Sequence, residues 1–112
     1  MYAKPVWQMW SETLTAQSAL AARQREFVET DLDVLATLLD LTETYYRLNR
    51  LQDGDRVLAK ANQGVSAIWH LISNNRLIED AEAERFKRAC NKLHRESLRI
   101  QRARKFRIPS VS

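Results

Sequence analysis

The sequence predicts an all-α protein, a small antiparallel bundle of three to four helices. Glycine and proline, which interrupt helices, occur only twice each in the 112 residues. Ala, Leu, Arg, Glu and Gln, which favour helices, are abundant. Because the composition is 45% apolar and 29% charged, we expect a folded chain with one hydrophobic core. Residues 1–104 are predicted to form a single helical domain, followed by a frayed tail at 105–112.

The segment between Pro5 and Leu51 has apolar residues at helical spacing and no further glycine or proline, so it forms one long helix or two. Thr30-Asp31-Leu32-Asp33 has the form of a capping box, which predicts helices at 6–29 and 31–50. One unbroken helix is the alternative, because a seven-residue apolar step crosses this joint. The step consists of Leu14, Ala21, Val28 and Leu35, interleaved with Leu32, Leu39 and Tyr46.

A third helix is predicted over residues 54–73. Gln52-Asp53-Gly54-Asp55 before it is the clearest turn signal in the chain, because Gly and Asp tolerate turn geometry. Ser73-Asn74-Asn75 ends the helix. Its apolar residues follow the i, i+3, i+4 rule and form a stripe that must be buried. The stripe consists of Val57, Leu58, Ala61, Val65, Ile68, Trp69 and Ile72.

The last helix is predicted over residues 77–104. It starts with acidic residues and ends with basic ones, which is the order that the helix dipole favours. Phe86, Leu93 and Ile100 stand seven residues apart and predict one narrow apolar seam, with Ala89, Cys90 and Ser97 between them. This seam faces the rest of the protein or a second copy.

The two helical segments around residue 50 share residue spacing with a known repeat. Tyr45 takes the position of a tyrosine in the first helix, and Asn49 that of a turn glycine. The other matching residues are Leu38, Leu41, Leu51, Gly54, Leu58 and Ala61. In these positions residues 35–68 resemble a single tetratricopeptide repeat, a helix pair that stacks into protein-binding superhelices. Thr42 and Ser66 depart from the pattern, and an ordinary antiparallel helix hairpin is the alternative.

Charge is divided unevenly along the chain. Residues 1–84 hold 8 Lys/Arg and 13 Asp/Glu, a net charge of −5, whereas residues 85–112 hold 10 Lys/Arg and only Glu96, a net charge of +9. The basic segment either pairs with the acidic body or binds an anionic partner, such as nucleic acid or an acidic protein. The candidate residues for such a partner are Arg95, Arg99, Arg102, Arg104, Lys105 and Arg107. No membrane partner is expected, because the seam is narrow and lacks tryptophan.

Aromatic residues are the candidates for contact with a protein partner. Trp7 and Trp10 are three residues apart and share a helix face, so they pack near Trp69 or form an interface. The predicted interaction residues are Trp7, Trp10, Tyr45, Tyr46 and Trp69.

Catalytic and metal-binding signatures are missing from the sequence. His70, His94 and the single Cys90 are not spaced as a ligand set, and no phosphate-binding loop or nucleophile motif occurs. We therefore expect no enzyme activity, no cofactor and no metal site. The lone cysteine and the absence of a leader or spanning segment predict a cytoplasmic protein.

The sequence thus predicts a non-enzymatic helical module for protein–protein interaction, such as an adaptor, an assembly factor or a small chaperone. A homo-oligomer is expected, because the leucine-rich segment around residue 40 has apolar residues on two faces. The alternative is a nucleic-acid-binding or regulatory protein whose basic last helix contacts phosphates.

Overall fold

The computed structural model is all-helical over the residues that it describes, which are 6–75 and 77–107 for the backbone and 16–75 and 77–105 for the side chains. Helix α1 covers Val6–Arg47, α2 covers Leu51–Asn74 and α3 covers Asp80–Arg107. No strand occurs in these ranges. The prediction of an all-α bundle is confirmed, with three helices in the described part of the chain.

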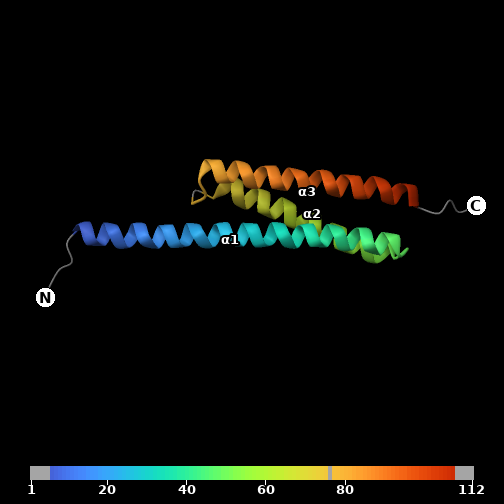
Figure 1. The fold of residues 1–112 in the computed structure, drawn as a ribbon, viewed down its shortest axis with the longest axis horizontal. Helices are drawn as coiled ribbons and strands as arrows, with labels where there is room; N and C mark the ends of the chain where they lie inside the picture. Colours follow the sequence, from blue (N-terminus) through green and yellow to red (C-terminus); the bar gives the residue numbers. More distant parts are fainter. Residues whose placement is uncertain (1–5, 76, 108–112) are drawn as a thin grey trace, which may run out of the picture.

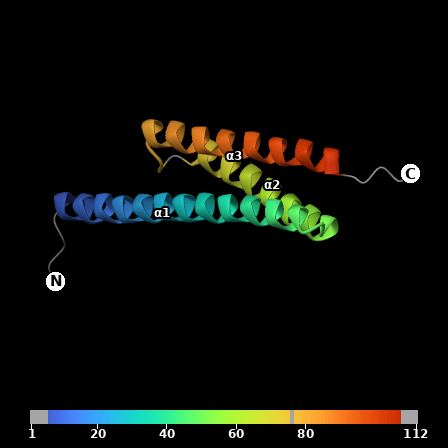
Figure 2. The same ribbon diagram turned by 45° about the vertical axis from the view of Figure 1, so that its right-hand side comes forward.

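The three helices lie side by side, and each contacts the other two. Helix α2 runs antiparallel to α1, and α3 runs antiparallel to α2, so α1 and α3 are parallel (Figures 1 and 2). The N-terminal part of α1 extends past the connection between α2 and α3 (Figure 1). A helix of 42 residues is about 63 Å long, whereas α2 has 24 residues and α3 has 28.

Helix α1 is continuous through residue 30, so the predicted break between 29 and 31 is wrong. The seven-residue step explains this result, because residues on both sides of the expected joint are buried in one core. Val28 is fully buried, and Leu35 and Leu39 are 5% and 2% exposed. Packing of both halves of α1 against the core stabilises the continuous helix more than a capping hydrogen bond at Thr30 would stabilise a break.

The turn between α1 and α2 lies at residues 48–50 and not at the predicted 52–55. Asn49 has a left-handed backbone with φ of 60°, and its N–H donates to the Tyr46 carbonyl. Asn accepts this conformation at less cost than most residues, which allows α1 to end here. Gly54 therefore lies inside α2, where its function is close packing. A Cβ at this position would overlap the Tyr46 ring.

The core consists of two clusters that follow the length of the bundle. One cluster lies toward the α2–α3 connection and the other toward the α1–α2 turn, and Leu93 packs against both. The first contains Val28, Leu35, Val65, Ile68, Ile72, Ile78, Phe86 and Cys90, and the second contains Leu39, Tyr46, Leu58, Ala61 and Ile100. The predicted stripe on α2 is buried apart from Trp69, which is exposed, and Val57, which is half-buried.

Asn75 organises the connection between α2 and α3. Its side-chain oxygen accepts a hydrogen bond from the Leu77 N–H at 2.9 Å, and its amide nitrogen donates to Gln24 at 3.3 Å. The second bond fixes the connection against α1. Helix α3 starts at Asp80, later than predicted, and continues past the predicted domain end at 104 as far as Arg107. Residues 108–112 of the predicted tail lie outside the described part.

Candidate interaction surfaces

The predicted aromatic residues lie in different environments. Tyr46 belongs to the core, since it is only 4% exposed. Tyr45 is half-buried beneath the Arg50 guanidinium, which lies 4.9 Å from the ring centre. Trp69 is 36% exposed at the edge of α2, where the Lys87 ammonium lies 5.6 Å from its ring. The described part of the chain therefore does not join these three rings into one patch.

The side chains of Trp7 and Trp10 lie outside the described residues. Their backbone belongs to the part of α1 that extends past the α2–α3 connection (Figure 1). Gln24 already contacts Asn75 at that connection, and residue 7 is about 25 Å further along the helix. The backbone thus places the start of α1 far from Trp69.

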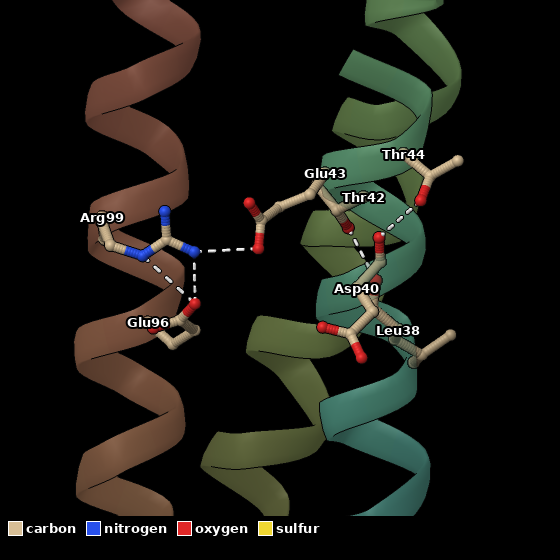
Figure 3. Close-up of polar contacts among 7 residues, drawn as sticks. All are labelled: Leu38, Asp40, Thr42, Glu43, Thr44, Glu96 and Arg99. Carbon is tan, nitrogen blue, oxygen red and sulfur yellow. Dashed lines mark hydrogen bonds and ion pairs between the residues drawn. The ribbon is translucent and has the colours of Figure 1, made fainter. Parts of the chain in front are cut away.

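Three arginines of α3 are paired with the body of the protein. Arg85 contacts Glu29 at 3.1 Å, and Arg99 contacts Glu43 at 2.8 Å, so both connect α3 to α1. Arg99 also donates to Glu96 on its own helix (Figure 3). These contacts show that the basic helix partly neutralises the acidic surface of its own chain.

Arg104, the third of these arginines, takes part in a contact that joins all three helices. Its guanidinium donates to both carboxylate oxygens of Asp55 on α2, at 2.8 and 2.9 Å. The Tyr46 hydroxyl of α1 donates to the same carboxylate at 2.6 Å. Burial, together with this bond to Asp55, raises the pKa of Tyr46 to about 12. The Arg104 hydrogen bonds hold the pKa of Asp55 below its usual value.

Other basic residues of α3 point away from α1 and α2. Arg88, Lys92, Arg95, Arg102 and Lys105 are exposed. Among the described side chains, no carboxylate forms an ion pair with any of these five. The side chain of Arg107 lies outside the described residues. The six predicted anion-binding residues are thus divided, because Arg99 and Arg104 pair with carboxylates of α1 and α2 while Arg95, Arg102 and Lys105 face solvent.

A surface that sequence reasoning missed lies on α1. Five large apolar residues stand seven positions apart along this helix, and each is between 37% and 62% exposed. They are Leu20, Phe27, Val34, Leu41 and Leu48, and we call them the outer row. The first four lie on α1, and Leu48 follows in the turn. The seven-residue spacing could have revealed the outer row, but not that it is exposed.

The outer row lies on the side of α1 that is turned away from α3. Glu29 and Glu43 mark the side of α1 that contacts α3. Leu35 faces α2, because a Cβ on Gly64 would meet the Leu35 side chain. Viewed down the axis of α1, Val34 and Glu29 lie on opposite sides of Leu35. The outer row therefore borders α2.

Threonines and acids flank the outer row along its other edge. Three exposed threonines each stand three positions after a residue of the outer row, and these are Thr30, Thr37 and Thr44. Thr37 and Thr44 donate their hydroxyl groups to the carbonyls of Asp33 and Asp40, both at 3.0 Å (Figure 3 for Thr44). Because these hydroxyls are bonded to the backbone, their methyl groups extend the apolar surface. Beyond them lies an acidic row of Glu26, Asp33 and Asp40, all exposed.

A groove of mixed polarity lies between α2 and α3, with a volume of about 480 Å³. Its lining includes Trp69, Cys90, His94 and Asn62, and the side-chain oxygen of Asn62 accepts a 2.5 Å hydrogen bond from the Ser97 hydroxyl. Burial raises the pKa of the Cys90 thiol, which makes it a poor nucleophile. Among the described side chains, those of residues 16–75 and 77–105, no group of three or more His, Cys, Asp or Glu could hold a metal ion.

Comparisons with known proteins match this chain to no protein-family model, no curated protein and no solved structure. In the described ranges, none of the helices combines the length and the apolar character needed to cross a membrane. The assignment of function therefore depends on the surfaces described above.

Proposed function

We propose that this protein is a non-enzymatic module for protein–protein interaction that binds another helix through the outer row of α1. It would act as an adaptor, an assembly factor or a small chaperone. The proposed location is the cytoplasm, in keeping with a single buried cysteine. The tetratricopeptide resemblance points to the same class of function, although the outer row supports the proposal independently.

The observation that carries the proposal is the exposure of the outer row. Its five residues span 28 positions, which is about 42 Å along a helix. Monomeric proteins seldom expose a continuous apolar surface of this length, because leaving it in water is costly. A second amphipathic helix covers such a stripe well, since its own apolar residues recur with the same period.

The experiment is capture of binding partners by the full-length protein, compared with a variant that carries Val34→Glu and Leu41→Glu. Both residues are exposed in the single chain, so their replacement should leave the free energy of unfolding of the monomer within about 0.5 kcal/mol of the original value. We expect the variant to lose the captured partner, whether this is another protein or a second copy.

Ala36→Glu is the matched control, because Ala36 is also exposed on α1 but lies outside the outer row. It should retain the partner. Equal capture by all three proteins would contradict the proposal.

A second candidate function is supported by the outward face of α3. Arg88, Arg95 and Arg102 stand seven residues apart and are exposed, so they form a positive ridge that suits phosphate contacts. If this ridge binds nucleic acid, Arg95→Gln with Arg102→Gln should weaken binding. The slope of the logarithm of the binding constant against the logarithm of the salt concentration should fall in magnitude by about one unit for each phosphate that the variant no longer neutralises. Failure to bind nucleic acid at low salt would dismiss this function.

A further inference from the structure

We propose that the partner of the outer row is a second copy of this chain, packed so that the two α1 helices run parallel about a two-fold axis along their length. This inference depends on the proposed function, because it names the occupant of the same surface. The experiment below separates the failure of one from the failure of the other.

The repeat on α1 favours a partner with the same repeat. A seven-residue row drifts around a straight helix by about 20° per heptad and stays in contact only if two helices supercoil around each other. The outer row keeps this period through four steps, from Leu20 to Leu48. A second α1 has the same period and the same length, so every residue of the row would meet its counterpart.

The threonines supply the second position of the heptad. In a two-stranded coiled coil, residues at i and i+3 alternate in the interface. Here the i+3 residues are Thr30, Thr37 and Thr44, and the last two bond their hydroxyls to their own backbone. Their methyl groups can therefore pack without leaving a hydroxyl unsatisfied. The seam between the two copies would be apolar along both positions from Phe27 to Thr44, whereas Arg23 takes the second position after Leu20.

The strip on α1 provides part of the area that a dimer needs. It is about 42 Å long and about 10 Å wide, which is about 400 Å² on each copy. The two strips together would bury about 800 Å², and contact of each α1 with the partner's α2 would add to this area, toward the about 1,600 Å² of a usual specific interface.

The distribution of charge distinguishes a parallel from an antiparallel arrangement of the two α1 helices. The acidic row of Glu26, Asp33 and Asp40 lies along one edge of the outer row, and α2 lies along the other. The exposed cations of α2 on its solvent side are Arg56 and Lys60. Asp53 of α2 is held mainly by Arg50, at 2.7 Å, and lies 4.0 Å from Arg56.

A two-fold axis along the helices places each acidic row over the partner's α2. An axis across the helices would instead place the two acidic rows against each other, which is unfavourable. The parallel arrangement is therefore the one that the charges support.

The test uses light scattering and cysteine cross-linking on the full-length chain. The chain has a mass of 13.1 kDa, so we expect a particle of about 26 kDa that reverts to the monomer in the Val34→Glu, Leu41→Glu variant. For cross-linking, Phe27→Cys, Val34→Cys and Leu41→Cys are each placed in a Cys90→Ala background. Parallel helices predict that each variant forms a disulfide with itself.

Antiparallel helices centred on Val34 would give a different pattern, in which Phe27→Cys links only to Leu41→Cys in a mixture of the two. That pattern would overturn the proposed orientation.

The oligomeric state decides which partner the outer row binds. If the protein is a monomer that still binds another protein through the outer row, the proposal of a second copy is wrong and the proposed function is preserved. A monomer whose outer-row variant also captures partners unchanged would overturn both. Ala36→Cys, outside the row, should not cross-link.

Discussion

Gly54 and Gly64 show how the absence of one carbon sets the distance between α1 and α2. Both glycines lie within α2, and a Cβ on either would meet a side chain of α1. At Gly54 the neighbour is the ring of Tyr46, which is held by its bond to Asp55. At Gly64 it is the end of the Leu35 side chain, which can change its rotamer. The two positions should therefore respond differently to the same substitution.

We expect Gly54→Ala to lower the free energy of unfolding by about 1–3 kcal/mol through overpacking, even though Ala favours helix more than Gly. Gly64→Ala should change it by less than about 1 kcal/mol, because the flexible Leu35 end can shift and the helix preference of Ala offsets the strain. Urea unfolding of both variants measures the difference. A larger loss at Gly64 than at Gly54 would contradict the role assigned to the Tyr46 ring.

Tyr46 should give the protein a stability that depends on alkaline pH. The pKa of Tyr46 rises from 10.0 to about 12 on folding, so the unfolded chain releases this proton first. The contribution is fully present below pH 10 and is lost as pH rises from 10 through 12.

Tyr46→Phe should be less stable at neutral pH by about 1 kcal/mol, because it lacks the hydrogen bond to Asp55. The difference in free energy of unfolding between the two proteins should then shrink between pH 10 and 12. Denaturant titrations from pH 8 upward measure this difference. A constant difference over the whole range would show that the Tyr46 hydroxyl ionises as it does in the unfolded chain.

At the scale of the helices, α1 is the element that the sequence left undecided. Two seven-residue rows occur on this helix, and hydropathy alone does not reveal which one is buried. The buried row includes the polar Thr42, which is fully enclosed and bonds its hydroxyl to the Leu38 carbonyl at 2.8 Å (Figure 3). The exposed row includes Leu41. A ranking by side-chain polarity would therefore have assigned these two neighbours to the wrong sides.

Helices α2 and α3 were predictable because each has one dominant apolar stripe. Their stripes match the buried residues of the structure, except at Trp69 and Val57 on α2 and at the partly buried Leu93 and Ala89 on α3. The predicted turn is in the wrong place because Gly54 is typical of turns, whereas here its small size serves helix packing. Asn49 could be identified as a stand-in for a turn glycine, but only the structure shows that α1 ends next to this residue.

Asp31→Pro tests whether α1 is continuous in solution. Proline is tolerated in the first turn of a helix but costs about 3 kcal/mol or more inside one. If a helix began at residue 31, the substitution would have little effect. Because α1 runs through this position, we expect a loss of about 3 kcal/mol in the free energy of unfolding.

Asp31→Ala is the control, and its effect should be near zero or slightly stabilising, because Ala is a better helix former than Asp. Thermal unfolding followed by circular dichroism suits both variants. Similar melting curves for the Pro and Ala proteins would argue for a joint near residue 31.

At the scale of the whole molecule, the division of the α3 arginines has a measurable consequence. Arg99 and Arg104 connect α3 to α1 and α2, whereas Arg95 and Arg102 have no described carboxylate partner. Exposed ion pairs contribute little individually, because water and salt screen them. Arg99→Gln with Arg104→Gln should therefore lower the melting temperature by only a few degrees, about 4 °C at most.

Arg95→Gln with Arg102→Gln removes the same net charge and should leave the melting temperature unchanged. Calorimetry at low salt compares the two pairs directly. Equal destabilisation by both pairs would mean that net charge, and not the contacts with Glu43 and Asp55, governs stability. The sequence could not predict this division, because it depends on which side of α3 faces the bundle.

The parallel course of α1 and α3 converts the charge imbalance along the sequence into one across the molecule. Acidic residues of α1 lie on one side, and the exposed cations of α3 lie on another. The protein therefore carries an electric dipole moment that is transverse to its long axis. Near a highly charged anionic polymer, such as DNA, the electric field of the polymer would exert a torque on this dipole and turn the monomer about its long axis until α3 faces the polymer. In the proposed dimer the two-fold axis runs along the helices, so the transverse dipole moments of the two copies cancel and only the monomer would be turned in this way.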